Sequence, residues 1–124
     1  MKTRRTQRKH SRLRFQIRPR LYHGGDIAIG PGKADLLEHI ARTGSLRKAA
    51  DAMEMSYMRA WTLVRTMNHC FKEPLVATKR GGAEGGEAHV TETGKAVLAA
   101  YRRMEAQSLR ATKQALSELS KHLR

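Results

Sequence analysis

Two short amphipathic segments lie close together in the chain and restrict the possible folds. Ser45 and Ser56 each precede a helical pattern, and serine is a favoured N-cap because its hydroxyl accepts a hydrogen bond from the helix backbone. We therefore expect helices over 46–53 and 56–69. Alanines on the inner face of the first helix would let the second cross it closely. Two short helices joined by a tight turn predict a helix-turn-helix.

Upstream of this pair the sequence predicts two strands and a helix. Apolar and polar residues alternate over 12–18, which is typical of a half-buried strand, and Pro19 favours an edge strand. Gly24-Gly25 marks a turn before a short apolar run at 27–29. A helix then begins at Gly30-Pro31, because proline is tolerated in the first helical turn. The apolar side chains expected to face the core from these elements are Leu13, Phe15, Ile17, Leu36, Leu37, Ile40 and Ala41.

The upstream helix carries two further local signals. Glu38 and Arg42 lie four residues apart, the spacing of a favourable ion pair on one helix face. Gly44 follows the last turn and is expected to be a left-handed C-cap.

Downstream, the pattern changes to that of a hairpin followed by a long helix. Pro74 ends the helical pattern, and 75–79 and 88–90 predict two strands joined by a glycine-rich loop over 81–86. Thr91 is an N-cap for a last helix that extends to about residue 121. The predicted fold is mainly α with a small β-hairpin wing: a winged helix-turn-helix with a long C-terminal dimerisation helix.

The charge of the chain points to a polyanionic partner. The sequence has 25 Lys and Arg against 11 Asp and Glu, and nine of the basic residues but no acid lie in residues 1–20. We expect residues 1–11 to form a disordered basic arm, 12–91 the winged domain and 92–124 the C-terminal helix. A tail that only aids solubility, or one that contacts an anionic lipid surface, is the alternative interpretation.

The second helix of the pair is the candidate reading element for double-stranded DNA. Arg59, Thr62 and Arg65 would face the major groove, and Ser45 and Ser56 would hold phosphates through backbone N–H groups. A three-helix cluster with surface arginines is the structural alternative. Tyr57 and Trp61 are interpreted chiefly as packing anchors. The predicted DNA-binding residues are Ser45, Arg47, Lys48, Ser56, Tyr57, Met58, Arg59, Thr62, Arg65, Lys79 and Arg80.

No residue pattern supports catalysis, a metal site or a cofactor. The six histidines contain no pair at metal-binding spacing, and the one cysteine, Cys70, is interpreted as a small core residue. One cysteine, no apolar run of membrane-spanning length and no signal-peptide pattern favour a cytoplasmic protein without a membrane partner. We expect a protein that is not an enzyme.

Five segments together resemble the N-terminal DNA-binding domain of the ModE family, the molybdate-responsive regulators of bacteria and archaea. They are Gly44-Ser45-Leu46-Arg47-Lys48-Ala49-Ala50, Met55-Ser56-Tyr57-Met58-Arg59-Ala60-Trp61, Glu73-Pro74-Leu75-Val76, 81–86 and 98–101. The resemblance covers about residues 13–105, and the helix-turn-helix is also similar to that of LysR-type regulators. It implies a dimeric transcription factor that binds a pseudo-palindromic operator, with its recognition helix starting at residues 56–59 and its wing at 79–87.

The sequence departs from this family in two places. Glu84 and Glu87 put acid in a wing that usually carries a basic residue, and acid that faces phosphate is repulsive. The chain also ends at Arg124, where the family continues into molybdate-binding domains. Molybdate or another oxyanion is therefore not expected as a partner of this chain alone.

The last helix offers a dimer interface. Val97, Leu98, Tyr101 and Met104 fit packing against the helix-turn-helix, and beyond Glu105 an apolar stripe with heptad spacing follows. Thr112 interrupts this stripe, and a lone helix folded on its own domain is the alternative. The predicted dimer-interface residues are Leu109, Leu116, Leu119 and Leu123.

The function expected from these patterns is a sequence-specific, homodimeric DNA-binding transcriptional regulator. Two other classes stay open. A non-specific, nucleoid-like or RNA-binding basic protein would bind random and specific duplexes alike. An adaptor that binds protein through its winged helix would bind no duplex at low salt.

Overall fold

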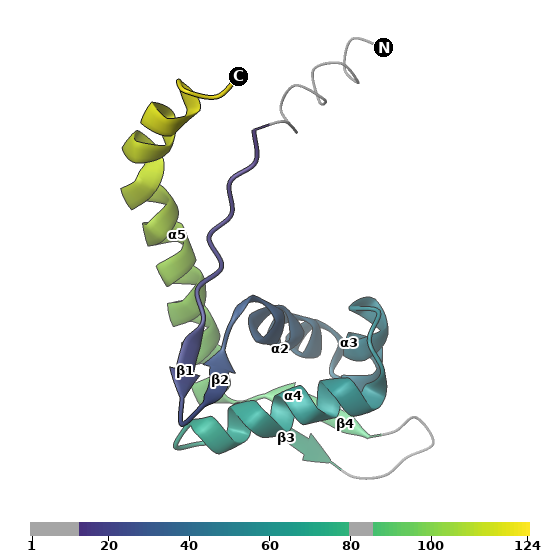
Figure 1. The fold of residues 1–124 in the computed structure, drawn as a ribbon. Coiled ribbons are helices and arrows are strands. Elements are labelled where there is room, and N and C mark those ends of the chain that lie inside the picture. Colours follow the sequence, from purple (N-terminus) through teal and green to yellow (C-terminus); the bar gives the residue numbers. More distant parts are fainter. Residues whose placement is uncertain (1–12, 80–85) are drawn as a thin grey trace, which may run out of the picture.

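The computed structural model describes residues 13–79 and 86–124, and Figure 1 shows a small helical body from which a long last helix projects. The mainly α winged helix-turn-helix with a long C-terminal helix is confirmed. The predicted basic arm, residues 1–11, lies outside the described residues. In chain order the elements are β1 (Leu21–His23), β2 (Asp26–Ile29), α2 (Pro31–Thr43), α3 (Leu46–Ala52), α4 (Tyr57–Cys70), β3 (Val76–Lys79), β4 (Glu87–Val90) and α5 (Glu92–Ser120).

Local chemistry fixes the end of α2 and the starts of α3 and α4 as the sequence predicts. Gly44 adopts φ 70°, a left-handed conformation that glycine reaches without strain, and it ends α2. The Ser45 hydroxyl accepts from the backbone N–H of Lys48 at 3.1 Å, and the Ser56 hydroxyl accepts from that of Arg59 at 3.0 Å. These caps set where α3 and α4 begin, and so fix the turn between them.

The core lies where α2, α3 and α4 meet the wing. Fully buried leucines and isoleucine from α2 contact small residues of α3 and α4, and these small residues allow the close crossing that the sequence predicts. Ala41 is exposed and lies outside the core, contrary to its predicted place in the stripe. The main core side chains are Leu36, Leu37, Ile40, Leu46, Ala49, Ala50, Ala60, Val64, Met67, Leu75 and Val76.

One amide side chain fastens the wing to α4. Asn68 accepts from the backbone N–H groups of Leu75 at 2.8 Å and Val76 at 3.2 Å, and it donates to the Val76 carbonyl at 3.0 Å. The wing itself is the predicted antiparallel hairpin, with Val76 paired to Val90. The N–H of Ala88 also donates to the carbonyl of Gly44 at 3.1 Å, which ties β4 to the start of α3.

The start of α5 is pressed against the other end of the wing. Thr91 caps this helix by accepting from the N–H of Gly94 at 3.0 Å, and its own hydroxyl donates to the Pro74 carbonyl at 2.7 Å. Gly94 is buried so closely against Leu75 and Val90 that a side chain has no room there.

An arginine with three carboxylate partners joins α5 to α2. Arg102 binds Asp35 at 2.8 Å, Glu38 at 2.6 Å and Glu105 at 2.9 Å. Burial opposes the charge of Arg102, but the hydrogen bonds to the three carboxylates outweigh it, so the pKa of Arg102 is raised above its usual value. The predicted pairing of Glu38 with Arg42 is wrong, because Glu38 turns to Arg102 instead.

The strand predicted over 12–18 is not formed by the described residues of this segment. Residues 13–20 pair with no strand among the residues that the structure describes, and Leu13 and Phe15 are 51% and 40% exposed. The first strand begins only at Leu21, where β2 follows after the predicted turn at Gly24-Gly25 and pairs with it. Alternation alone does not make a strand, because each backbone N–H and C=O also needs a partner in a neighbouring strand.

Candidate nucleic-acid interface

The outer face of α4 is open to solvent, as the sequence predicts. Its inner face is buried through Ala60, Val64 and Met67. The helix therefore presents a polar and basic surface while its other side is held by the core. The exposed side chains of this surface are Met58, Arg59, Thr62, Arg65 and His69.

The helix caps limit how α3 and α4 can bind phosphate. The backbone N–H groups of Lys48 and Arg59 already donate to Ser45 and Ser56. Those two groups are satisfied within the protein, so the phosphate contacts predicted for the helix starts would use the other N–H groups of each first turn, and they stay a prediction. The side chains of Arg47, Lys48 and Arg59 are exposed and keep their charges at the surface.

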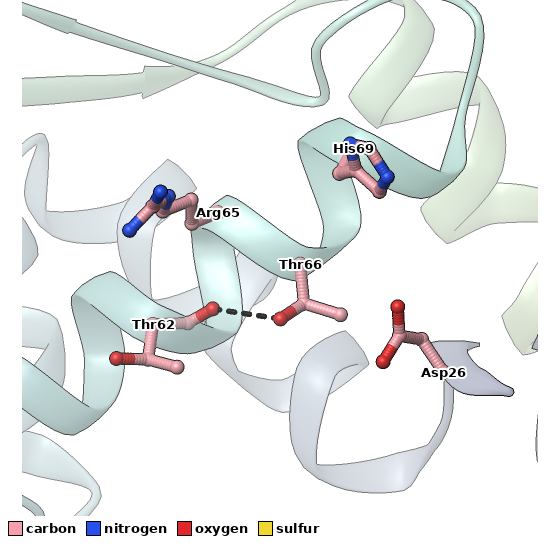
Figure 2. Close-up of a pocket in the computed structure, with 5 residues that line it drawn as sticks. All are labelled: Asp26, Thr62, Arg65, Thr66 and His69. Carbon is pink, nitrogen blue, oxygen red and sulfur yellow. Dashed lines mark hydrogen bonds between the residues drawn. The ribbon is translucent and has the colours of Figure 1, made fainter.

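Threonine hydroxyls along α4 bond to their own helix. The Thr62 hydroxyl donates to the Met58 carbonyl at 2.9 Å, and Thr66 donates to the Thr62 carbonyl at 3.0 Å, the bond drawn in Figure 2. A hydroxyl has one proton to donate and two lone pairs. In this conformation Thr62 therefore presents a methyl group and an acceptor oxygen outward.

A hollow of about 330 Å³ lies beside this face, between the start of β2 and the stretch of α4 from Thr62 to His69. It is lined by Asp26, Thr62, Arg65, Thr66 and His69, and Figure 2 shows the Arg65 side chain directed away from Asp26. Asp26 was missed by the sequence reasoning, because it follows a turn and belongs to no periodic pattern. A carboxylate there disfavours phosphate, so it marks a boundary of the basic surface.

Two aromatic rings on α4, those of Tyr57 and Trp61, each lie close to an arginine. The guanidinium carbon of Arg47 lies 5.0 Å from the ring centre of Tyr57, and that of Arg65 lies 5.2 Å from the ring centre of Trp61. Tyr57 also packs against the core, as expected of an anchor, whereas Trp61 is 38% exposed and is not among the side chains that adjoin the core in the described ranges. The interpretation of Trp61 as a packing anchor is therefore wrong.

Two of the charged residues discussed for the wing, one basic and one acidic, lie in its described part. Lys79 and Glu87 are exposed and stand opposite each other in the register of β3 and β4. Opposite charges at such a pair are favourable, so the charge of Lys79 is partly offset where the wing would meet DNA. Arg80 and Glu84 lie outside the described residues.

Three of the four predicted dimer residues lie on α5, and the body of the protein does not fully cover them. Leu109 and Leu119 are exposed, Leu116 is half-buried, and Leu123 lies just beyond the end of the helix at Ser120. Tyr101 and its neighbours Val97 and Leu98 pack inward as expected, but Met104 is exposed rather than packed against the body. Among the described helices, none is both long and apolar enough to cross a membrane.

Known proteins resemble a large part of the chain. No family model matches it. It is 41% identical over 85 residues to the molybdenum-pterin-binding protein MopA of Rhodobacter capsulatus, covering 68% of this chain and 32% of that protein. It is 38% identical over 92 residues to the molybdenum transport protein ModE of Azotobacter vinelandii, covering 74% and 34%.

A third relative carries a regulatory name. Over 71 residues the chain is 35% identical to the DNA-binding transcriptional dual regulator ModE of Escherichia coli K12, which covers 57% of this chain and 27% of that protein. The chain thus matches about a third of the length of these relatives. Over the segment that it shares with them, which holds the helix-turn-helix predicted from its sequence, the chain is similar to these proteins at 35–41% identity, in agreement with its resemblance to a ModE-family N-terminal domain.

Proposed function

We propose that this protein is a sequence-specific regulator of transcription that binds double-stranded DNA as a homodimer, on a pseudo-palindromic operator. The proposal rests mainly on α4. Its outer face is exposed and basic, and its inner face is held in place by the core and the wing. A recognition helix must combine these two properties, because it is inserted into the major groove as a rigid element. The names of the ModE relatives support the same function.

The proposed roles follow from where the side chains lie. Arg59 and Arg65 extend from the exposed face of α4 and suit the acceptor atoms of guanine or phosphate oxygens. Met58 and the Thr62 methyl suit the methyl group of thymine. Arg47, Lys48 and Lys79 supply attraction to phosphate that does not depend on sequence.

A homodimer is proposed because one recognition helix contacts too few base pairs to define a site. Leu119 on α5 is 65% exposed, and it lies on the same stripe as Leu109 and Leu116. Burial of this stripe against a second copy would remove apolar surface from water. A two-fold dimer would then present two α4 helices to half-sites about one helical turn of DNA apart, roughly 34 Å.

The proposal is tested by selecting duplexes from a random-sequence library and measuring their affinity by fluorescence anisotropy. We expect a selected duplex to bind at least ~10³-fold more tightly than its scrambled version at ~150 mM salt. Arg110→Ala, which removes a charge from exposed α5, is a matched control for Arg59→Ala. Equal affinity for both duplexes would indicate a non-specific binder, and no binding at low salt would indicate a protein-binding adaptor.

A further inference from the structure

Trp61 is a large aromatic side chain that the core does not account for. It is the single tryptophan of the chain, it is 38% exposed, and it lies on α4 between residues of the outer face. The exposed indole has another contact, on the outer face of α4.

That contact is with Arg65, one helical turn further along α4. The Arg65 guanidinium carbon lies 5.2 Å from the indole centre, within the range of a cation–π interaction. In the part of the chain that the structure describes, no ion pair involves Arg65. Arg65 thus differs from Arg102, which forms ion pairs with three carboxylates. The indole ring is the neighbour that orients Arg65.

Stacking suits an arginine that must bind something else. A guanidinium that stacks on a ring uses its flat face, and this arrangement leaves its N–H groups, which lie in its plane, available to an acceptor. It also restricts the side chain before binding, which reduces the conformational entropy lost on binding. Arg47 lies on the Tyr57 ring at 5.0 Å in the same way, so two arginines of the predicted DNA-binding set are held by rings.

We propose that Trp61 is a positioning residue of the DNA interface, whose indole holds the Arg65 guanidinium over the outer face of α4 before DNA binds. Arg65 then meets guanine or phosphate acceptors with its donor edge already exposed. This inference rests on the proposed function, and it adds that the Trp61 indole orients the Arg65 side chain for its contact with DNA.

The first test uses the free protein, because Trp61 is its only indole fluorophore. Arg65→Ala is expected to raise the acrylamide quenching constant of Trp61 fluorescence, since the guanidinium no longer covers the ring. Arg110→Ala, which removes an exposed arginine from α5, is expected to leave it unchanged. Equal quenching constants in the wild type and Arg65→Ala would overturn the contact, whatever the protein binds.

The second test is a double-mutant cycle on a duplex selected from a random library. Trp61→Leu is expected to raise Kd about two- to fivefold, the range that an exposed cation–π contact supports. In an Arg65→Ala background the same change is expected to leave Kd unaltered. Trp61→Tyr, which keeps a ring, is expected to retain more affinity than Trp61→Leu and serves if the leucine variant does not fold.

The outcomes separate this role from the function on which it rests. A duplex that binds, with additive losses in the cycle, would overturn the positioning role alone. Failure of every duplex to bind would overturn the proposed function, and the positioning role with it, while the quenching experiment would still decide whether Arg65 covers Trp61.

Discussion

Replacing Gly94 by alanine is the sharpest test of how the wing is held on α5. A Cβ at this position would fall inside the contact distance of the Leu75 carbonyl oxygen and lie 2.6 Å from Cγ1 of Val90. The Leu75 carbonyl is not free to move aside, because it accepts from the backbone N–H of Thr91 at 2.9 Å. Relief of the clash therefore requires α5 to separate from the wing.

The magnitude follows from two opposing contributions. Overpacking a close-packed site costs about 1–3 kcal/mol, and a backbone neighbour places this site at the upper end of that range. Alanine recovers up to about 1 kcal/mol of helix propensity relative to glycine. We expect Gly94→Ala to lower the free energy of unfolding by about 2 kcal/mol, and to lower Tm by roughly 8 °C for a domain of this size.

This change is measured by urea denaturation, with unfolding monitored by circular dichroism. The slope of the unfolding free energy against urea concentration checks that unfolding stays two-state. Gly32→Ala is the matched control, because Gly32 also lies in the first turn of a helix but a Cβ there would meet nothing within 4 Å. We expect it to stabilise the protein by about 0.4–1 kcal/mol. If Gly94→Ala were as stable as Gly32→Ala, the argument for close packing at the base of the wing would be refuted.

The remaining predictions concern the wing anchor, the DNA-facing residues and α5. Asn68→Ala is expected to cost about 2–4 kcal/mol in urea denaturation, since two backbone N–H groups lose their acceptor; a loss near zero would contradict this. Arg59→Ala is expected to weaken a selected duplex by about 1–3 kcal/mol by anisotropy, and equal losses on scrambled DNA would refute base reading. Lys48→Ala is expected to weaken all duplexes alike and to reduce the salt slope by about one unit. Leu116→Glu is expected to give a monomer by light scattering, and a dimer that persists at micromolar protein would refute the α5 interface.

The parts of the fold that local chemistry controls could be predicted from the sequence. Ser45 and Ser56 cap their helices, Gly44 takes the left-handed conformation, and the hairpin pairs as expected, because each depends on residues only a few positions away. The exposed face of α4 was also predictable, since the helical period alone separates it from the buried face.

The predictions that were wrong concern contacts between segments that are distant in the sequence. Residues 13–18 alternate like a strand, but no strand in the described part of the chain pairs with them. Arg102 attracts Glu38 across 64 positions, so the local pairing with Arg42 is lost. The role of Asn68 is visible in the sequence pattern, because a polar residue four positions after buried Val64, on the inner face of α4, indicates a buried hydrogen-bond partner.

The attachment of the wing to α4 has a consequence for how a DNA site would be selected. Asn68 joins the two elements through three hydrogen bonds, so they approach a duplex as one body with a fixed spacing. A rigid protein surface cannot adjust to a groove of the wrong width, and the duplex must bend or twist to fit. Sequences that deform easily are then favoured at positions that no side chain touches. Part of the operator's information would reside in its mechanical properties rather than in the edges of its bases.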